Sequence, residues 1–376
     1  MEELKDEEEK NKSRDIKSKK RKRKFLLLFI IVLFLIIIIL IINTKRKNKN
    51  NKNCRSFENY SFSAIFSTET ENQNINLIYK LPSKDLITCN LTKMNIDNEE
   101  IKPRLNYIFP SPGHHIVYFW INIAECNSLD KMFLDNINMI SISFTDNFNT
   151  NYIKSMDGMF YNCNKLTSLD LSTFNTENVE ILDNIFYGCN NLISVNLSNW
   201  NTTKARYYIA MFYSCESLTS IDLSSFKTEN AEYMSYFFNG CNSLKSIDLL
   251  NFNTKNVLSM NNMFYNCTSL TSLDLSNFDT KKVEDMSFIF NKCSSLQYLN
   301  ISSFNNQNLK YKEKMFYECY SLSSLDISSF NDFNLEIYNI FETTPLFGTI
   351  FVNQNFKNYA KRNLPQEWEI KIVDYK

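Results

Sequence analysis

The chain has 376 residues, 44% of them hydrophobic and only 5 Gly and 6 Pro, so it is long and apolar enough to form folded domains. Residues 1–53 hold 16 Lys/Arg against 7 Asp/Glu, whereas residues 54–376 hold 25 against 34. An acidic body excludes a nucleic-acid surface of the usual kind, because phosphate contacts need clustered Lys and Arg on the folded part.

A basic tail at 1–24 ends in KSKKRKRK, and an unbroken run of eighteen apolar residues follows at 25–42. This run is long enough for a transmembrane helix. We interpret it as an uncleaved signal anchor, because it continues into a polar linker at 43–53 rather than ending at small residues. Ten Lys/Arg lie in the fifteen residues before the run and six in the fifteen after it. The positive-inside rule then predicts a single-pass protein with a cytosolic N-terminus and its remainder extracellular or lumenal, at the cell surface.

Residues 54–125 alternate apolar and polar side chains in SFSAIFS, NINLIYK and HIVYFWI, with a Pro-Gly turn before the last segment. This pattern predicts a small β-sandwich-like domain. Three cysteines lie outside the repeats described next, at Cys54, Cys89 and Cys126. One disulfide among them is expected in an oxidising compartment, and the pair is left open.

Internal repetition dominates the rest of the chain. Seven cysteines stand 26 residues apart: Cys163, Cys189, Cys215, Cys241, Cys267, Cys293 and Cys319. A regular period of this size predicts a solenoid, which we place at 126–341 and expect to be closed by a C-terminal cap at 342–376.

One unit, residues 263–288, shows the expected local structure. Its leucines follow L-x-x-L-x-L, which predicts a short strand with apolar side chains turned inward. Thr280 is then placed to cap a helix that carries an apolar stripe as far as Phe290. The predicted fold class is therefore α/β, a leucine-rich-repeat solenoid with a parallel sheet on its concave face and short helices on its convex face.

The repeat pattern C-x-x-L-x-x-L-D-L-S-x-F-x-T-x-x-V-x-x-M-x-x-M-F resembles the 26-residue lipoprotein-type repeat of BspA-like leucine-rich-repeat surface proteins. The resemblance covers residues 132–341, and its first turn is degenerate, with Asn136 where the cysteine stands elsewhere. It implies a role in adhesion or host contact.

The seven cysteines are expected to be free, buried and structural. In-register side chains of stacked turns point in parallel, which disfavours disulfides, and they spread along a line, which disfavours a metal site. The only histidines are the adjacent His114 and His115, whose side chains would face opposite sides of a strand. With no nucleophile motif or phosphate loop either, the sequence predicts no cofactor and no enzyme activity.

Outward strand residues form two polar rows on the predicted concave face, one of Ser and one of Asp or Asn. Solvated carboxylates relieved by neighbouring hydroxyls are the favoured interpretation, and a bound divalent cation or basic ligand is the alternative. The candidate ligand-binding residues are Asp170, Asp222, Asp248, Asp274, Asp326, Ser220, Ser246 and Ser272. We expect the solenoid to bind a protein or surface macromolecule; the alternatives are a self-associating coat component and an enzyme accessory subunit.

Overall fold

The computed structural model describes residues 59–81, 83–84, 87–88, 90–124, 126–330, 348–354, 357–363 and 368–373. They belong to one compact unit that extends from Asn59 to Lys376. The basic tail, the apolar run and the polar linker of 1–53 lie outside the described residues. Within the described part of the chain, no helix is both long and apolar enough to cross a membrane. This finding corrects the prediction of a single-pass membrane protein with extracellular or lumenal repeats, which rested on the run at 25–42.

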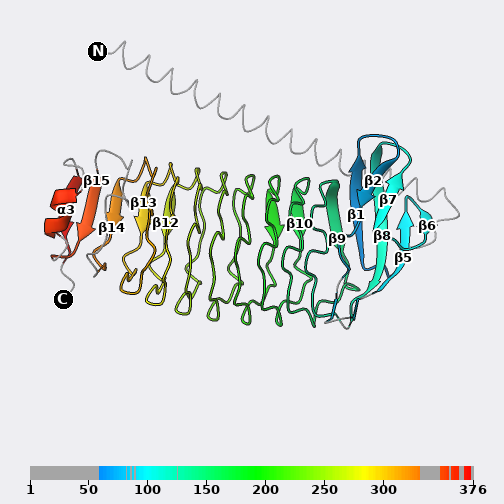
Figure 1. The fold of residues 1–376 in the computed structure, drawn as a ribbon, viewed down its shortest axis with the longest axis horizontal. Coiled ribbons are helices and arrows are strands. Elements are labelled where there is room, and N and C mark those ends of the chain that lie inside the picture. Colours follow the sequence, from blue (N-terminus) through cyan, green and yellow to red (C-terminus); the bar gives the residue numbers. More distant parts are fainter. Residues whose placement is uncertain are drawn as a thin grey trace, which may run out of the picture. The chain divides into compact units, whose positions relative to one another are not determined.

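An antiparallel sheet of five strands, in the order β6-β5-β8-β1-β9, opens the unit (Figure 1). Alternation builds this sheet: along β1 every second side chain is buried, so one face packs into the core. The five strands are β1 (Phe62–Thr68), β5 (Asn90–Ile96), β6 (Glu99–Ile101), β8 (Gly113–Asn122) and β9 (Met139–Phe144). Two small antiparallel pairs accompany it: β2 (Gln73–Asn76) with β7 (Asn106–Phe109), and β3 (Ser83–Lys84) with β4 (Ile87–Thr88).

Strand β9 joins the β domain to the solenoid. Its residues fall in the stretch predicted as the degenerate first repeat, yet it pairs with β1, with Phe62 opposite Phe144. Phe144 also packs edge-on against Phe174 of the next turn, at 4.8 Å between ring centroids. The β domain therefore covers the first turn of the solenoid and continues its core.

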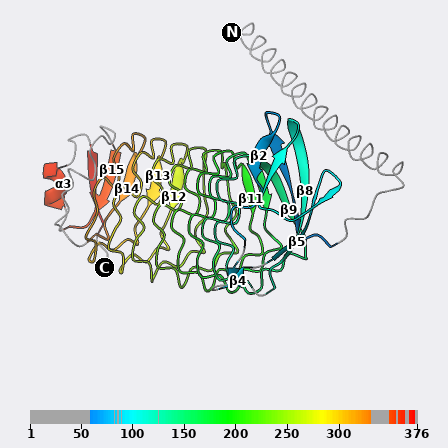
Figure 2. The same ribbon diagram turned by 45° about the vertical axis from the view of Figure 1, so that its right-hand side comes forward.

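The repeats form a stack of turns, one for each unit (Figure 2). Short parallel strands mark one row of this stack, and equivalent residues of adjacent units pair directly, as in Leu273 with Leu299. The strands are β10 (Ser168–Asp170), β11 (Ser194–Asn196), β12 (Ser272–Asp274), β13 (Tyr298–Asn300) and β14 (Ser324–Asp326). A second row consists of single parallel bridges that run from Ser128 to Tyr311.

The helices predicted for the convex face are absent. Over the described ranges, the only helix is α3 (Lys357–Asn363), which follows the repeats. The segment expected to be helical from Thr280 to Phe290 contains Phe288 at φ 59°, a left-handed conformation that a right-handed helix cannot include. The helical-face leucine-rich-repeat architecture is therefore wrong for this chain.

Two consecutive turns replace each helix. The N–H of Ile289 donates to the carbonyl of Met286 at 3.2 Å, and the N–H of Cys293 donates to that of Phe290 at 3.1 Å. Left-handed residues occupy the third position of both turns, as in type II turns. They recur in two rows: Gly158, Asn184, Ala210, Tyr236, Asn262, Phe288 and Lys314, then Asn162, Gly188, Ser214, Gly240, Asn266, Lys292 and Glu318.

Backbone hydrogen bonds in these turns run to the next unit. The N–H groups of Phe288 and Phe290 donate to the carbonyls of Glu313 and Met315, at 2.8 and 3.0 Å. Thr280, expected as a helix cap, is buried and links units as well: its Oγ1 donates to Asn305 O at 2.9 Å and accepts from Asn305 N at 2.6 Å. The solenoid is thus bonded along its stacking axis on every side.

The core consists of side chains repeated from turn to turn. Buried phenylalanines from Phe160 to Phe316 stack with ring centroids between 5.2 and 6.1 Å apart and interplanar angles of 20° or less. Beyond β14, strands β15 (Gly348–Val352) and β16 (Trp368–Ile372) continue the parallel row. Trp368 is buried there, which covers the last turn with an apolar ring.

Candidate functional site

The predicted ligand-binding residues lie in register on the outer side of the strand row. Ser272 pairs with Tyr298 and Asp274 with Asn300, so equivalent side chains stack. Asp170, Asp222, Asp248 and Asp274 are exposed, as are Ser220, Ser246 and Ser272, while Asp326 is partly buried. We call this surface the strand face.

Every aspartate of the strand face already holds a backbone group. The Oδ1 atoms of Asp222 and Asp274 accept the N–H of the residue two positions on, at 2.9 and 3.0 Å. The same contact occurs at Asp170, Asn196, Asp248, Asn300 and Asp326. An amide oxygen accepts this bond as well as a carboxylate does, which explains why Asn can stand in the row. Hydrogen bonds from Ser224 lower the pKa of Asp222, and those from Ser172 lower the pKa of Asp170.

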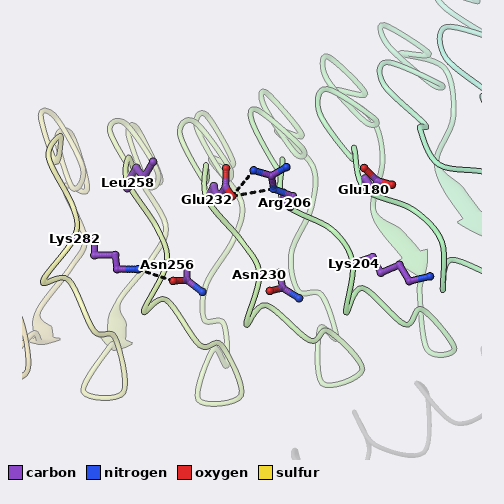
Figure 3. Close-up of a pocket in the computed structure, with 8 residues that line it drawn as sticks. All are labelled: Glu180, Lys204, Arg206, Asn230, Glu232, Asn256, Leu258 and Lys282. Carbon is purple, nitrogen blue, oxygen red and sulfur yellow. Dashed lines mark hydrogen bonds and ion pairs between the residues drawn. The ribbon is translucent and has the colours of Figure 1, made fainter.

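A different face carries an open groove of about 510 Å³ that crosses consecutive turns (Figure 3). Its lining comes from the short segment that follows the buried Thr of each unit. The lining residues are Glu180, Lys204, Arg206, Asn230, Glu232, Asn256, Leu258 and Lys282. Sequence reasoning missed this surface because the segment was assigned to a helix.

Two rows of side chains build the groove. We define the charged row as Lys154, Glu180, Arg206, Glu232, Leu258, Glu284 and Lys310, and the amide row as Asn178, Lys204, Asn230, Asn256, Lys282 and Asn308. Backbone bonds hold the charged row in register: the N–H of Leu258 donates to Glu232 O at 2.8 Å, and that of Glu284 to Leu258 O at 2.9 Å. Adjacent side chains of a row are therefore neighbours, about 4.8 Å apart at the backbone.

The two rows satisfy their charges differently. In the charged row, Arg206 donates through Nε and Nη2 to Oε1 of Glu232, at 2.8 and 2.5 Å, and Lys310 donates to Oε2 of Glu284 at 2.9 Å. In the amide row, the ammonium of Lys282 donates to the neutral Oδ1 of Asn256 at 2.8 Å, and Lys204 does the same to Asn178 at 2.6 Å. The groove thus presents both signs of charge, with Leu258 as an apolar position in the charged row.

The stacked turns correspond to a known sequence family. The model of the family described as "Mycoplasma protein of unknown function, DUF285" matches residues 127–249 and 232–359, which is more than half of the chain. The chain belongs to the DUF285 family. No curated protein matches it. The matched DUF285 residues contain the groove, the strand face and the cysteine ladder.

The seven ladder cysteines of the DUF285 turns are free and buried. Each Sγ donates to a phenylalanine carbonyl of the preceding turn, as Cys241 does to Phe212 O and Cys267 to Phe238 O, both at 3.2 Å. Burial raises the pKa of all seven thiols, to about 12 for Cys189 and Cys293. The ladder is therefore a set of inert structural thiols.

We predict that thiol reagents ignore these seven cysteines in the folded protein and modify all seven after denaturation without reductant. Burial blocks access and keeps each sulfur protonated in the native state. Mass spectrometry after iodoacetamide treatment at pH 8, with and without guanidinium, measures both states. Two or fewer reactive thiols in the denatured protein would mean that the ladder is paired. Cys126 lies outside the ladder and is disulfide-bonded.

His115 holds two loops of the β domain together. Its Nδ1 lies 2.6 Å from Asp97 Oδ2, its Nε2 lies 3.2 Å from Thr68 Oγ1 and 3.0 Å from Ser111 O, and its ring stacks on Phe109 at 4.3 Å. This Asp–His–Thr line resembles a proton relay. However, His115 and Thr68 are 7% and 5% exposed, and Thr68 Oγ1 donates to Ser111 O, so the hydroxyl has no open side for a substrate. His114, by contrast, is exposed.

Proposed function

We propose that this protein is a binding module, not an enzyme, and that the groove on its DUF285 turns holds part of another polypeptide. The observation that carries the proposal is the groove itself, an open surface with charged, amide and apolar side chains in a fixed register. Repeat proteins commonly bind through such extended surfaces. The resemblance of the repeats to the BspA-like pattern supports an adhesive role in particular.

The groove is favoured over the strand face by its hydrogen bonding. On the strand face, Asp222 and Asp274 already accept backbone N–H groups that end their strands. In the groove, Leu258 is partly exposed and Glu232 has one carboxylate oxygen that accepts no hydrogen bond from the described residues. The strand-face residues remain a second candidate surface, for a basic ligand or a divalent cation. Among the described residues, no group of three or more His, Cys, Asp or Glu is placed to hold a metal ion.

We predict that replacing Asp222, Asp248 and Asp274 together by Asn changes stability by less than about 0.5 kcal/mol, the usual range for surface substitutions. Asn keeps the oxygen that accepts the backbone N–H, as Asn196 does in the natural row. The removal of three stacked like charges compensates for any weaker hydrogen bond. Urea unfolding of the full chain measures the effect. A loss above 2 kcal/mol would show that the charges themselves hold the strands.

The same variant separates the two surfaces in a binding experiment. Its counterpart is the exchange Arg206→Glu with Glu232→Arg, which keeps the ion pair and the net charge but alters the groove. Crosslinking and pulldown from an extract of the source cells should capture a partner with the parent and the triple variant, and should lose it with the exchanged pair. The opposite pattern places binding on the strand face. Capture of this chain alone favours the alternative function, a self-associating structural component.

A further inference from the structure

The charged row alternates in sign with one exception. Glu180, Arg206 and Glu232 read minus, plus, minus, and Glu284 with Lys310 reads minus, plus. Between these two groups stands Leu258, at the position where the alternation calls for a cation. Since adjacent members are about 4.8 Å apart at the backbone, Glu232 and Glu284 flank Leu258 at about 10 Å from one another.

Both flanking carboxylates have an oxygen to spare. Arg206 uses only Oε1 of Glu232, and Lys310 uses only Oε2 of Glu284. The second oxygen of each carboxylate accepts no hydrogen bond from any residue that the structure describes. Leu258 itself is partly exposed between them, which offers an apolar surface one side chain wide.

We propose that Leu258, Glu232 and Glu284 form a socket for one Arg or Lys side chain of a partner polypeptide. This inference rests on the proposed binding function and names the chemistry of the ligand. The aliphatic stem of the incoming side chain packs on Leu258, and its charged head reaches the two open carboxylate oxygens. The incoming cation thereby completes the alternation of the row.

The nearest competing charge is Lys282 in the amide row. Its ammonium is directed to Asn256 Oδ1 and away from the charged row, as Figure 3 shows. Lys282 therefore does not fill the socket, but it repels a cation that approaches from its side. A basic ligand must enter from the carboxylate side, and removal of Lys282 should strengthen its binding.

The test uses the full-length protein and a fluorescein-labelled ten-residue peptide with Arg at alternate positions and Thr between them. A matched peptide carries neutral citrulline in place of each Arg. Fluorescence anisotropy at low salt measures the affinity, because exposed charge contacts weaken as ionic strength rises. Three variants are compared with the parent: Leu258→Arg, Lys282→Gln and the control Leu250→Arg. Leu250 is 57% exposed and lies outside the groove, so its substitution adds the same charge elsewhere.

We expect Leu258→Arg to weaken binding of the Arg peptide about tenfold, which corresponds to about 1.4 kcal/mol, because the new side chain occupies the socket. Leu250→Arg should change the affinity by less than twofold, and Lys282→Gln should strengthen it. Thermal melting gives a second readout: Leu258→Arg should raise Tm by completing the row, whereas Leu250→Arg should not. Equal weakening by the two Arg substitutions, equal affinity for the citrulline peptide, or no binding to the parent would each overturn the socket. A partner that is still lost on exchange of Arg206 and Glu232 would then leave the binding function intact.

Discussion

Deleting half of one unit, residues 241–253, should abolish cooperative folding, whereas deleting the whole unit from Cys241 to Asn266 should leave a folded protein. The whole-unit deletion places Cys267 directly after Gly240. Its Sγ then meets Phe212 O, the acceptor that Cys241 uses now, and every inter-turn bond keeps its partner. Because each turn contacts only its neighbours, the shorter stack loses one layer and no register.

The half-unit deletion destroys that register. Thr254, a buried member of the threonine row, would follow Gly240 where the cysteine now stands. Core side chains would meet backbone N–H and carbonyl groups without acceptors or donors, and the loss should exceed the 5–15 kcal/mol by which such domains are stable. Far-UV circular dichroism with thermal melting compares the two deletions with the parent. Similar melting curves for both would contradict the turn-by-turn register.

The second large effect is alkaline unfolding. Folded-state pKa values of the ladder thiols are raised by burial, to about 12 for Cys189 and Cys293, from an ordinary value of 9.0. Above pH 9 the unfolded chain therefore releases thiol protons that the folded chain retains. Stability is fully present below that pH and falls as pH rises toward the folded values. Each thiol costs up to about 1.4 kcal/mol per pH unit, so seven together cost roughly 10 kcal/mol between pH 9 and 10, enough to unfold the protein.

A single replacement isolates the thiol contribution from that of other titrating groups. Cys241→Ala lowers stability at pH 7 by removing a buried sulfur, but it should also reduce the further loss between pH 8 and pH 10 by about 1.4 kcal/mol. The control is Tyr320→Phe, which removes a titratable group that is 55% exposed and should leave the pH dependence unchanged. Urea unfolding at the two pH values provides all four free energies. An unchanged pH dependence for Cys241→Ala would mean that this thiol ionises in the folded state.

The sequence alone determined the repeat and its core. Seven cysteines at a constant spacing require in-register stacking, so Cys241 and Cys267 had to form one row and the leucines of L-x-x-L-x-L another. The same reasoning placed Asp222 and Asp274 on one exposed line. These conclusions depend only on period and alternation, which a linear pattern contains.

The tertiary structure decided the local conformation between those rows. Apolar residues three and four apart suit a helix and also two consecutive turns, and the residues that choose the turns are left-handed Phe288 and Lys292 rather than glycines. Their N–H groups find acceptors in the next unit, beyond the window of any local pattern. The groove depends on the same step: Arg206, Glu232 and Leu258 are 26 residues apart in sequence and become neighbours only when the turns stack. Hydrogen bonding between units, not the propensity within one, selected this backbone and with it the candidate binding surface.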